Sequence, residues 1–241
     1  MLIRNEPLAG KTVLEVGSGL GRTTRNLASG LSDHPGTNLI VTDVTDRYFD
    51  QIRNSLGPAD IKPQFIQTDA CDLAGIEPES IDYIVCNFAL CEINSDIGRG
   101  TLALAKFLLV LKPGGKLFVE EEMPISEANS AAQNTWSLIW RVLKSAQTLT
   151  QHKTATNEYH PVVLSEICKI VGFTDVKWEA SSRTHPLAWL EPRIDLLASH
   201  MHGFPSPQIK QMFVHLANDV KNRAKEAGKI EIPIYKLSAV K

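Results

Sequence analysis

The stretch VLEVGSGLGR, residues 13–22, decides the fold of this chain. Its apolar start predicts a buried strand from Lys11 to Val16, and three glycines, Gly17, Gly19 and Gly21, follow at once. A helix is expected from about Arg22 to Leu31. Glycine accepts positive φ and lets a ligand approach the backbone with no Cβ in the way. The stretch therefore predicts a strand, a ligand-accessible turn and a helix, which is how an α/β sheet opens.

The residues that follow repeat this alternation of strand and helix. Four further strands and two helices are predicted at residues 38–44, 63–69, 81–87 and 116–121 and at residues 48–56 and 97–111, the second helix ending at Pro113 and Gly114. The strand IDYIVCN, residues 81–87, is apolar almost throughout, as expected of a strand buried on both faces. This order predicts a mostly parallel sheet with helices on both faces.

The second half of the chain is predicted to be richer in helix. Expected there are a helix at 127–148, a polar irregular stretch to His160, a short helix from Pro161 that ends at Gly172, a strand at 173–180, a helical excursion at 187–228 and a final strand at 230–241. We expect one domain, residues 1–241, with its core sheet at 11–122, 161–180 and 229–241. Only ten residues precede the first strand, so cover for the site is expected from helical insertions at about 123–160 and 184–228.

Composition narrows the classes of function. The formal charge of −2 and pI of about 6.4 disfavour bulk nucleic-acid binding. The four cysteines form no C-x-x-C pair and have no histidines at zinc spacing, so we expect no metal site, and reduced thiols in a cytoplasmic protein. The most apolar segment, Leu102 to Leu111, is too short to span a membrane.

The glycine pattern separates two kinds of nucleotide site. A dinucleotide fold would show G-x-G-x-x-G, but Arg22 stands at the third glycine position, and the spacing is E-x-G-x-G-x-G. Asp43, Asp69 and Asn87 each close a predicted strand, at the sheet edge where open α/β folds bind ligands. An acidic residue about 20 positions after the glycines is placed to accept hydrogen bonds from ribose hydroxyls.

These motifs resemble those of class I S-adenosylmethionine-dependent methyltransferases of the small-molecule type. The resemblance extends to KPGG (112–115), VGF (171–173) and the ending IPIYKLSAVK (232–241). It implies a seven-stranded sheet whose last strand is antiparallel and lies between strands five and six, with helical insertions after strands five and six. It also implies S-adenosyl-L-methionine as cofactor and S-adenosyl-L-homocysteine as product.

The resemblance assigns roles to the residues at the strand ends. Asp43 would hold the ribose, Asp69 and the next backbone amide the adenine, and Asn87 and Phe88 would lie near the methionine part. The cofactor-binding set expected in full is Glu15, Gly17, Ser18, Gly19, Gly21, Asp43, Val44, Asp69, Ala70, Asn87 and Phe88. For Asp43 and Asp69 the alternative is a helix-capping role. For Glu15 it is a structural role, in which the buried carboxylate bonds amides of the loop.

The residues that would act on the acceptor follow no fixed motif. Methyl transfer from a sulfonium is an in-line displacement that needs positioning more than a fixed set of catalytic groups. If the acceptor is a hydroxyl, a general base would help, and His160 with Tyr159 is the candidate pair; the alternative is that either residue only caps the following helix.

The predicted function is methyl transfer to a small-molecule O-, C- or N-acceptor. NFAL (87–90) stands where methylases of DNA or protein amides would carry N-P-P-Y or D-P-P-Y, which favours a small acceptor. Two alternatives stay open: a noncatalytic S-adenosylmethionine-binding regulator or partner subunit, and an NAD-linked oxidoreductase.

Overall fold

The computed structural model describes residues 2–152 and 156–241, so part of the predicted irregular stretch, residues 153–155, lies outside the described residues. The chain divides into two compact units. The sheet unit comprises Met1–Glu121, Pro161–Glu179 and Lys236–Lys241, and the helical unit comprises Glu122–His160 and Ala180–Tyr235. Most residues of the helical unit belong to the two predicted insertions. That the whole chain is one domain stays a prediction.

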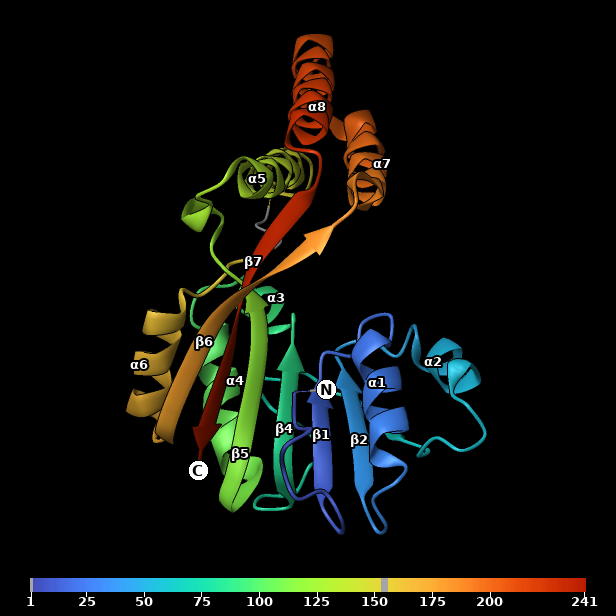
Figure 1. Cartoon of the computed structure of the whole chain (residues 1–241), viewed down its shortest axis with the longest axis vertical. Coiled ribbons are helices and arrows are strands. Elements are labelled where there is room, and N and C mark those ends of the chain that lie inside the picture. The colour runs from blue at the N-terminus through green and yellow to red at the C-terminus, as the bar shows by residue number, and fades with distance from the viewer. Residues whose placement is uncertain (1, 153–155) are drawn as a thin grey trace. The chain divides into compact units, whose positions relative to one another are not determined.

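The sheet has seven strands in the order β3-β2-β1-β4-β5-β7-β6 (Figure 1). They are β1 (Thr12–Val16), β2 (Asn38–Asp43), β3 (Gln64–Gln67), β4 (Ile81–Asn87), β5 (Leu111–Glu122), β6 (Thr174–His185) and β7 (Ile230–Val240). β1 pairs in parallel with β2 and β4, β2 with β3, and β4 with β5. Lys241 exchanges backbone hydrogen bonds with Gly114 and Gly115, so β7 ends beside the start of β5 and runs antiparallel to it. The predicted fold class and the place of the last strand are confirmed.

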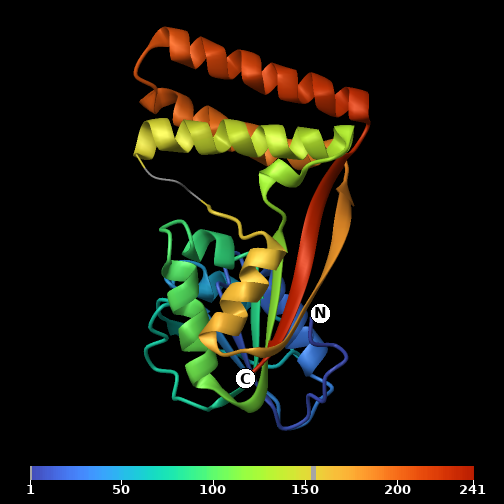
Figure 2. The same ribbon diagram turned by 90° about the vertical axis from the view of Figure 1, so that its left-hand side faces the viewer.

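Helices cover both faces of the sheet unit, with α1 on one face and α4 and α6 on the other (Figures 1 and 2). Its helices are α1 (Arg22–Leu31), α2 (Phe49–Ser55), α3 (Leu90–Ile93), α4 (Arg99–Val110) and α6 (Pro161–Val171). Under α1, Leu27 and Leu31 pack with Val13, Val41 and Val85 of the adjacent strands β1, β2 and β4, all with at most 1% of their surface exposed. This core fixes the strand ends that carry the predicted site.

Two stretches of the sheet unit differ from the prediction. The helix expected to end at Pro113 and Gly114 stops at Val110, and β5 begins at Leu111. Ile81 pairs with Leu111 while Tyr83 pairs with Lys116, so KPGG forms a bulge inside the strand rather than a turn before it. The four-residue helix α3 is also absent from the prediction, because one turn is too short to show a helical period.

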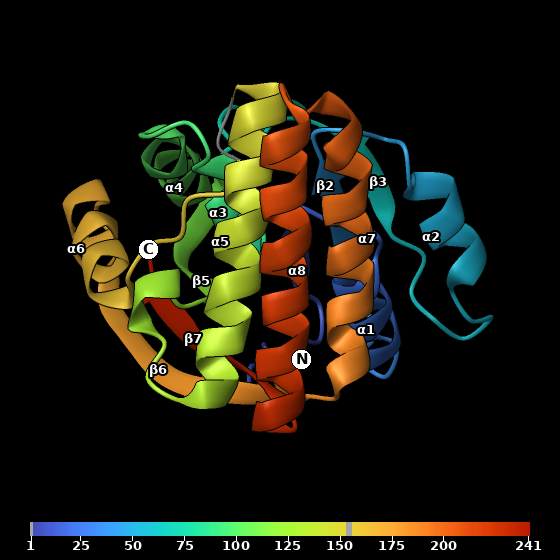
Figure 3. The same cartoon turned by 90° about the horizontal axis from the view of Figure 1, so that it is seen from above.

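Two long helices and a shorter one form the body of the helical unit: α5 (Ala131–Gln151), α8 (Pro207–Ala227) and the ten-residue α7 (Glu191–His200), which lie side by side (Figures 2 and 3). Short 3₁₀ turns η1 (Ile125–Glu127), η2 (Leu187–Leu190) and η3 (Met201–Gly203) accompany them and divide the predicted excursion. Ser130 and Ser206 cap α5 and α8 by accepting hydrogen bonds from Gln133 N and Ile209 N at 3.2 Å. No helix of the described residues is long and apolar enough to cross a membrane.

Candidate functional site

The glycine loop between β1 and α1 holds three glycines at positive φ: 75° at Gly17, 48° at Gly19 and 79° at Gly21. Two of them are needed for packing. A Cβ on Gly17 would lie 2.4 Å from Ala89 Cβ, and one on Gly21 would lie 2.5 Å from Ile52 Cγ1. The loop is therefore held tightly against α2 and the start of α3.

Gly19 differs from its two neighbours, because nothing lies within 4 Å of the place where its Cβ would be. Its N–H donates to Asp43 Oδ2 at 2.9 Å, and Thr45 N donates to Asp43 Oδ1 at 3.1 Å. The hydroxyl of Ser18 lies 3.5 Å from Asp43 Oδ2. These bonds fix the carboxylate of Asp43 beside bare backbone at the end of β2.

A cavity of about 290 Å³ opens at this edge of the sheet unit. The residues that line it are Val16, Gly17, Thr42, Asp43, Val44, Thr68, Asp69, Ala70, Ala89, Glu92, Ile93, Ser95 and Arg99. Five of the predicted cofactor residues are among them: Gly17, Asp43, Val44, Asp69 and Ala70. The side chain of Val44 is 67% exposed, which leaves an apolar surface available to a ligand at the cavity.

Asp69, the predicted adenine contact, already has two partners. Its Oδ1 accepts a hydrogen bond from Cys71 N at 2.8 Å, and its Oδ2 pairs with Arg99 Nη2 at 2.5 Å. The Cys71 N–H, followed by Arg99, holds the pKa of Asp69 below its usual range. Each carboxylate oxygen keeps a second lone pair, so Asp69 can still accept a hydrogen bond from a ligand.

Glu15 lies in β1 beneath the loop, with 1% of its surface exposed. Among the described residues neither of its oxygens has a hydrogen-bond partner, and burial raises its pKa to about 8. The structural role in which Glu15 bonds loop amides is wrong. Gly17 N and Ser18 N donate instead to Thr42 O, at 2.9 and 3.2 Å, and Gly19 N donates to Asp43.

Asn87 and Phe88 close β4 but do not line the cavity. Asn87 Nδ2 donates to Thr23 Oγ1 of α1 at 2.7 Å, while Asn87 Oδ1 is buried with no partner among the described residues. Phe88 takes a φ of 54°, and its N–H donates to Glu120 O at 2.8 Å. The placement of these two residues near the methionine part of a cofactor stays a prediction.

The structure adds cavity residues from the segment after β4, among them Glu92 and Arg99, which the sequence prediction missed. Leu90 N at the start of α3 donates to Glu121 Oε1 at 2.7 Å, in buried surroundings, and this bond anchors the segment. Burial, and to a lesser extent the charge of Asp43, raise the pKa of Glu92. No motif spacing marks these residues; the only signal available was their closeness in sequence to the end of β4.

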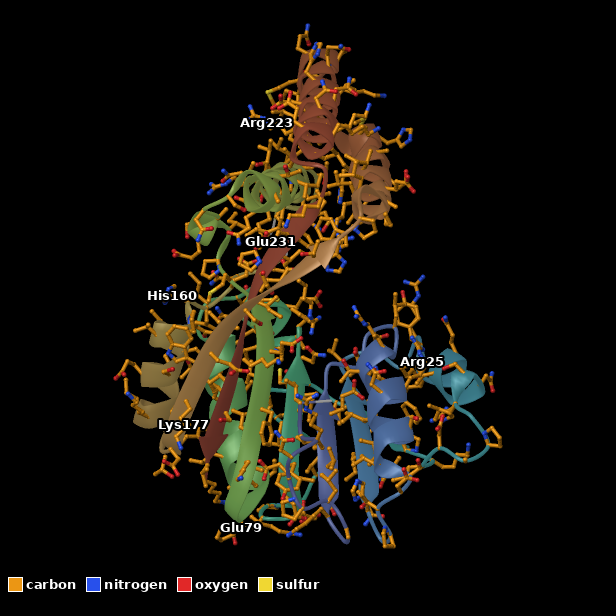
Figure 4. All side chains as sticks on the ribbon, in the orientation of Figure 1. Arg25, Glu79, His160, Lys177, Arg223 and Glu231 are labelled. Carbon is orange, nitrogen blue, oxygen red and sulfur yellow. The ribbon has the colours of Figure 1, made fainter. Side chains whose placement is uncertain are left out.

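Tyr159 and His160, the predicted acceptor-side pair, belong to the helical unit, whereas every residue that lines the cavity belongs to the sheet unit. His160, labelled in Figure 4, directly precedes α6. Their catalytic role stays a prediction. Among the described residues there is no group of three or more His, Cys, Asp or Glu that could hold a metal ion.

Other polar groups gather inside the helical unit. Trp136, fully buried on α5, donates its Nε1 hydrogen to Glu122 Oε2 at 2.9 Å. The Arg193 guanidinium stacks 3.4 Å from the centre of the Trp189 ring, and Lys144 pairs with Glu158 at 2.7 Å. These contacts lie within the unit and stabilise its helices.

Comparison with known proteins identifies the region that carries the cavity. Residues 13–115 match the family model described as "Methyltransferase domain". The match runs from β1 into β5 and includes every residue that lines the cavity. No curated protein sequence matches the chain.

Solved structures share the fold over nearly the whole chain. A candidate methyltransferase of Bacillus halodurans is 14% identical with a TM-score of 0.64, covering 99% of this chain and 96% of its own. The 4+2 cyclase SpnF is 20% identical with a TM-score of 0.60, covering 99% and 78%.

A third structure, phosphoethanolamine N-methyltransferase 2 of Haemonchus contortus in complex with S-adenosylmethionine, is 18% identical with a TM-score of 0.57. The alignment covers all of this chain and 51% of the nematode enzyme, so the chain spans about half its length. At these identities the likeness shows a shared fold.

Proposed function

We propose that this chain, whose residues 13–115 are a methyltransferase domain, transfers the methyl group of S-adenosylmethionine to a small-molecule acceptor. One observation carries the proposal: the cavity at the ends of β1, β2 and β4 brings the bare backbone of the glycine loop next to the fixed carboxylate of Asp43. Ligands of open α/β sheets bind at this edge.

The residues present fit an adenosyl cation. Asp43 offers lone pairs to ribose hydroxyls, and Asp69 with the amide of Ala70 offers an acceptor and a donor to adenine. Glu15, buried beneath the loop and without a hydrogen-bond partner among the described residues, offers a carboxyl group that a polar part of the cofactor could satisfy. The cofactor would supply an electrophilic methyl group on a sulfonium, and the protein's part is to hold it, exclude water and orient the acceptor.

A small acceptor is supported by charge and by the compared proteins. The net charge of −2 provides no excess of Lys and Arg for a nucleic-acid backbone. The Haemonchus enzyme has also been solved with phosphomonomethylethanolamine and S-adenosylhomocysteine, a small substrate and the demethylated cofactor. All four cysteines are free thiols, which supports a cytoplasmic location.

A second candidate is a protein of this fold that binds the cofactor without transferring its methyl group. SpnF, a 4+2 cyclase, shows that the fold can accompany a different activity. Transfer of a labelled methyl group from the cofactor into a metabolite extract separates the two. Label in a small molecule supports the methyltransferase, and its absence despite tight cofactor binding supports the second candidate.

The first experiment is calorimetric titration with S-adenosylmethionine, S-adenosylhomocysteine and NAD. We expect the first two to bind and NAD to show no binding. Asp43→Ala removes a charged hydrogen-bond acceptor, so cofactor binding should weaken by about 2 to 5 kcal/mol. Asp46→Ala, an exposed acid close in sequence but outside the cavity lining, is the matched control. Unchanged affinity in Asp43→Ala would show that the ribose lies elsewhere.

The predicted base can be tested once an acceptor is found. If His160 takes the acceptor's proton, His160→Gln should lower kcat by about 100-fold or more and leave the Kd for S-adenosylmethionine within twofold. Tyr159→Phe tests its neighbour in the same assay. A kcat unchanged in both variants would assign the pair to helix capping.

A further inference from the structure

The charged side chains that line the cavity do not balance. Three are acids, Asp43, Asp69 and Glu92, and one is a base, Arg99. Arg99 pairs with Asp69 at 2.5 Å, which leaves Asp43 and Glu92 with no cation among the residues lining the cavity. Two like charges that face one cavity repel each other, and a bound cation relieves this repulsion.

The position of Glu92 follows from how α3 is held. A Cβ on Gly17 would meet Ala89 Cβ at 2.4 Å, so the residue before α3 lies directly against the glycine loop. The buried bond from Leu90 N to Glu121 fixes the first residue of the helix. Glu92 is therefore presented to the cavity from an anchored turn, beside the loop and within electrostatic range of Asp43.

The cofactor and its product differ in the charge on the sulfur atom, and the carboxylates that line the cavity interact with that charge. S-adenosylmethionine carries a sulfonium cation, whereas S-adenosylhomocysteine carries a neutral thioether one methyl group smaller. The loss of one methyl group by itself changes the affinity for a ligand only modestly. The loss of a full positive charge in a partly enclosed site changes the affinity more, because the charge interacts with the neighbouring carboxylates. The sulfur is bonded to the 5′ carbon of the ribose, so it must lie close to the sugar that Asp43 would hold.

We propose that Glu92 is a specificity-determining residue, whose carboxylate makes the site prefer the sulfonium cofactor over its neutral product. The inference rests on the proposed cofactor and adds to it a means of product release. Asp43 would be engaged by the ribose hydroxyls, so Glu92 is the carboxylate left to face the positive charge. Once the methyl group has left, that attraction is lost and the product is held less tightly.

The test measures the Kd of both ligands in Glu92→Gln, which keeps the size of the side chain and removes its charge. We expect S-adenosylmethionine to bind about 10-fold more weakly and S-adenosylhomocysteine to change by less than twofold. An adenosyl analogue with an amine in place of the sulfonium should follow the cofactor. Glu92→Asp, which keeps the charge, should retain most of the preference.

Asp46→Asn is the matched control, because it removes one negative charge from an exposed residue that does not line the cavity. It should leave both Kd values within twofold. An equal change for the two ligands in Glu92→Gln, or no change in either, overturns the inference. If the wild-type protein binds neither ligand, the proposed function fails instead, so the two failures are distinguishable.

Discussion

Glu15 is a buried acidic side chain whose raised pKa lowers the stability of the folded protein as pH rises. Its carboxyl group lies in the second-to-last position of β1, 1% exposed, and none of the described residues forms a hydrogen bond to it. Burial disfavours the charged form and raises its pKa to about 8 from the usual 4.5. Between these values the folded protein holds a proton that the unfolded chain has lost.

This difference predicts a pH dependence. Because the folded state binds more protons between pH 4.5 and 8, its stability must fall as pH rises through that window. Glu15→Gln lacks this titration. The difference between the free energy of unfolding of Glu15→Gln and that of the wild type should therefore increase by about 3 kcal/mol, in favour of the variant, between pH 4.5 and pH 7. Urea unfolding of both proteins at the two pH values measures it. A gap that narrows with rising pH would mean that Glu15 is ionised and paired.

The residues of the glycine loop and strand ends were predictable because the chemistry fixes their type and spacing. Positive φ calls for glycine, and the carboxylate of Asp43 must close β2, so both are visible in one sequence. Glu92 and Arg99 were not predictable in this way. They reach the cavity through the anchoring of α3 and the start of α4, and that placement depends on contacts with Gly17 and Glu121 that are distant in the chain.

Among the elements, β5 departs most from what its sequence indicates. Pro and Gly next to each other ordinarily end a helix and form a turn, yet here KPGG lies within a twelve-residue strand. The antiparallel neighbour β7 explains the difference, since Gly114 N donates to Lys241 O and Lys241 N donates to Gly115 O. Pairing with the chain's last residues turns a predicted loop into a bulged strand.

The bulge leaves little room for a side chain at Gly115. A Cβ there would lie 2.9 Å from Lys112 O and 3.1 Å from Asp82 O, and both are backbone atoms with little freedom to move. Gly115→Ala should lower the free energy of unfolding by about 2 to 3 kcal/mol. Gly114→Ala meets nothing within 4 Å and carries only the strain of its φ of 77°, about 1 kcal/mol. Equal losses in urea unfolding would contradict a specific role for Gly115.

In the whole molecule, the two compact units are not joined by a single linker. β5, β6 and β7 each contribute residues to both units, so three of the four places where the chain passes from one unit to the other lie within a strand. If the helical unit unfolds, the parts of β5, β6 and β7 that belong to it lose their structure. Each of these parts is continuous with a part of the same strand that belongs to the sheet unit. We therefore expect the units to unfold together, as a small cooperative protein does.

Tryptophan fluorescence can test this coupling, because Trp136, Trp140 and Trp189 lie in the helical unit and only Trp178, on β6, lies in the sheet unit. Trp178 is 41% exposed, so Trp178→Phe should fold and leave a fluorescence signal from the helical unit alone.

S-adenosylmethionine at 100 times its Kd, bound at the sheet-unit cavity, should stabilise the protein by about 2.7 kcal/mol. With coupled units the free energy of unfolding that fluorescence reports rises by that amount, and the urea midpoint rises by that amount divided by the m-value. A midpoint that does not move at saturating cofactor would show that the helical unit unfolds independently. As a control, adding Asp43→Ala should reduce the midpoint shift if the shift arises from cofactor bound at the proposed site.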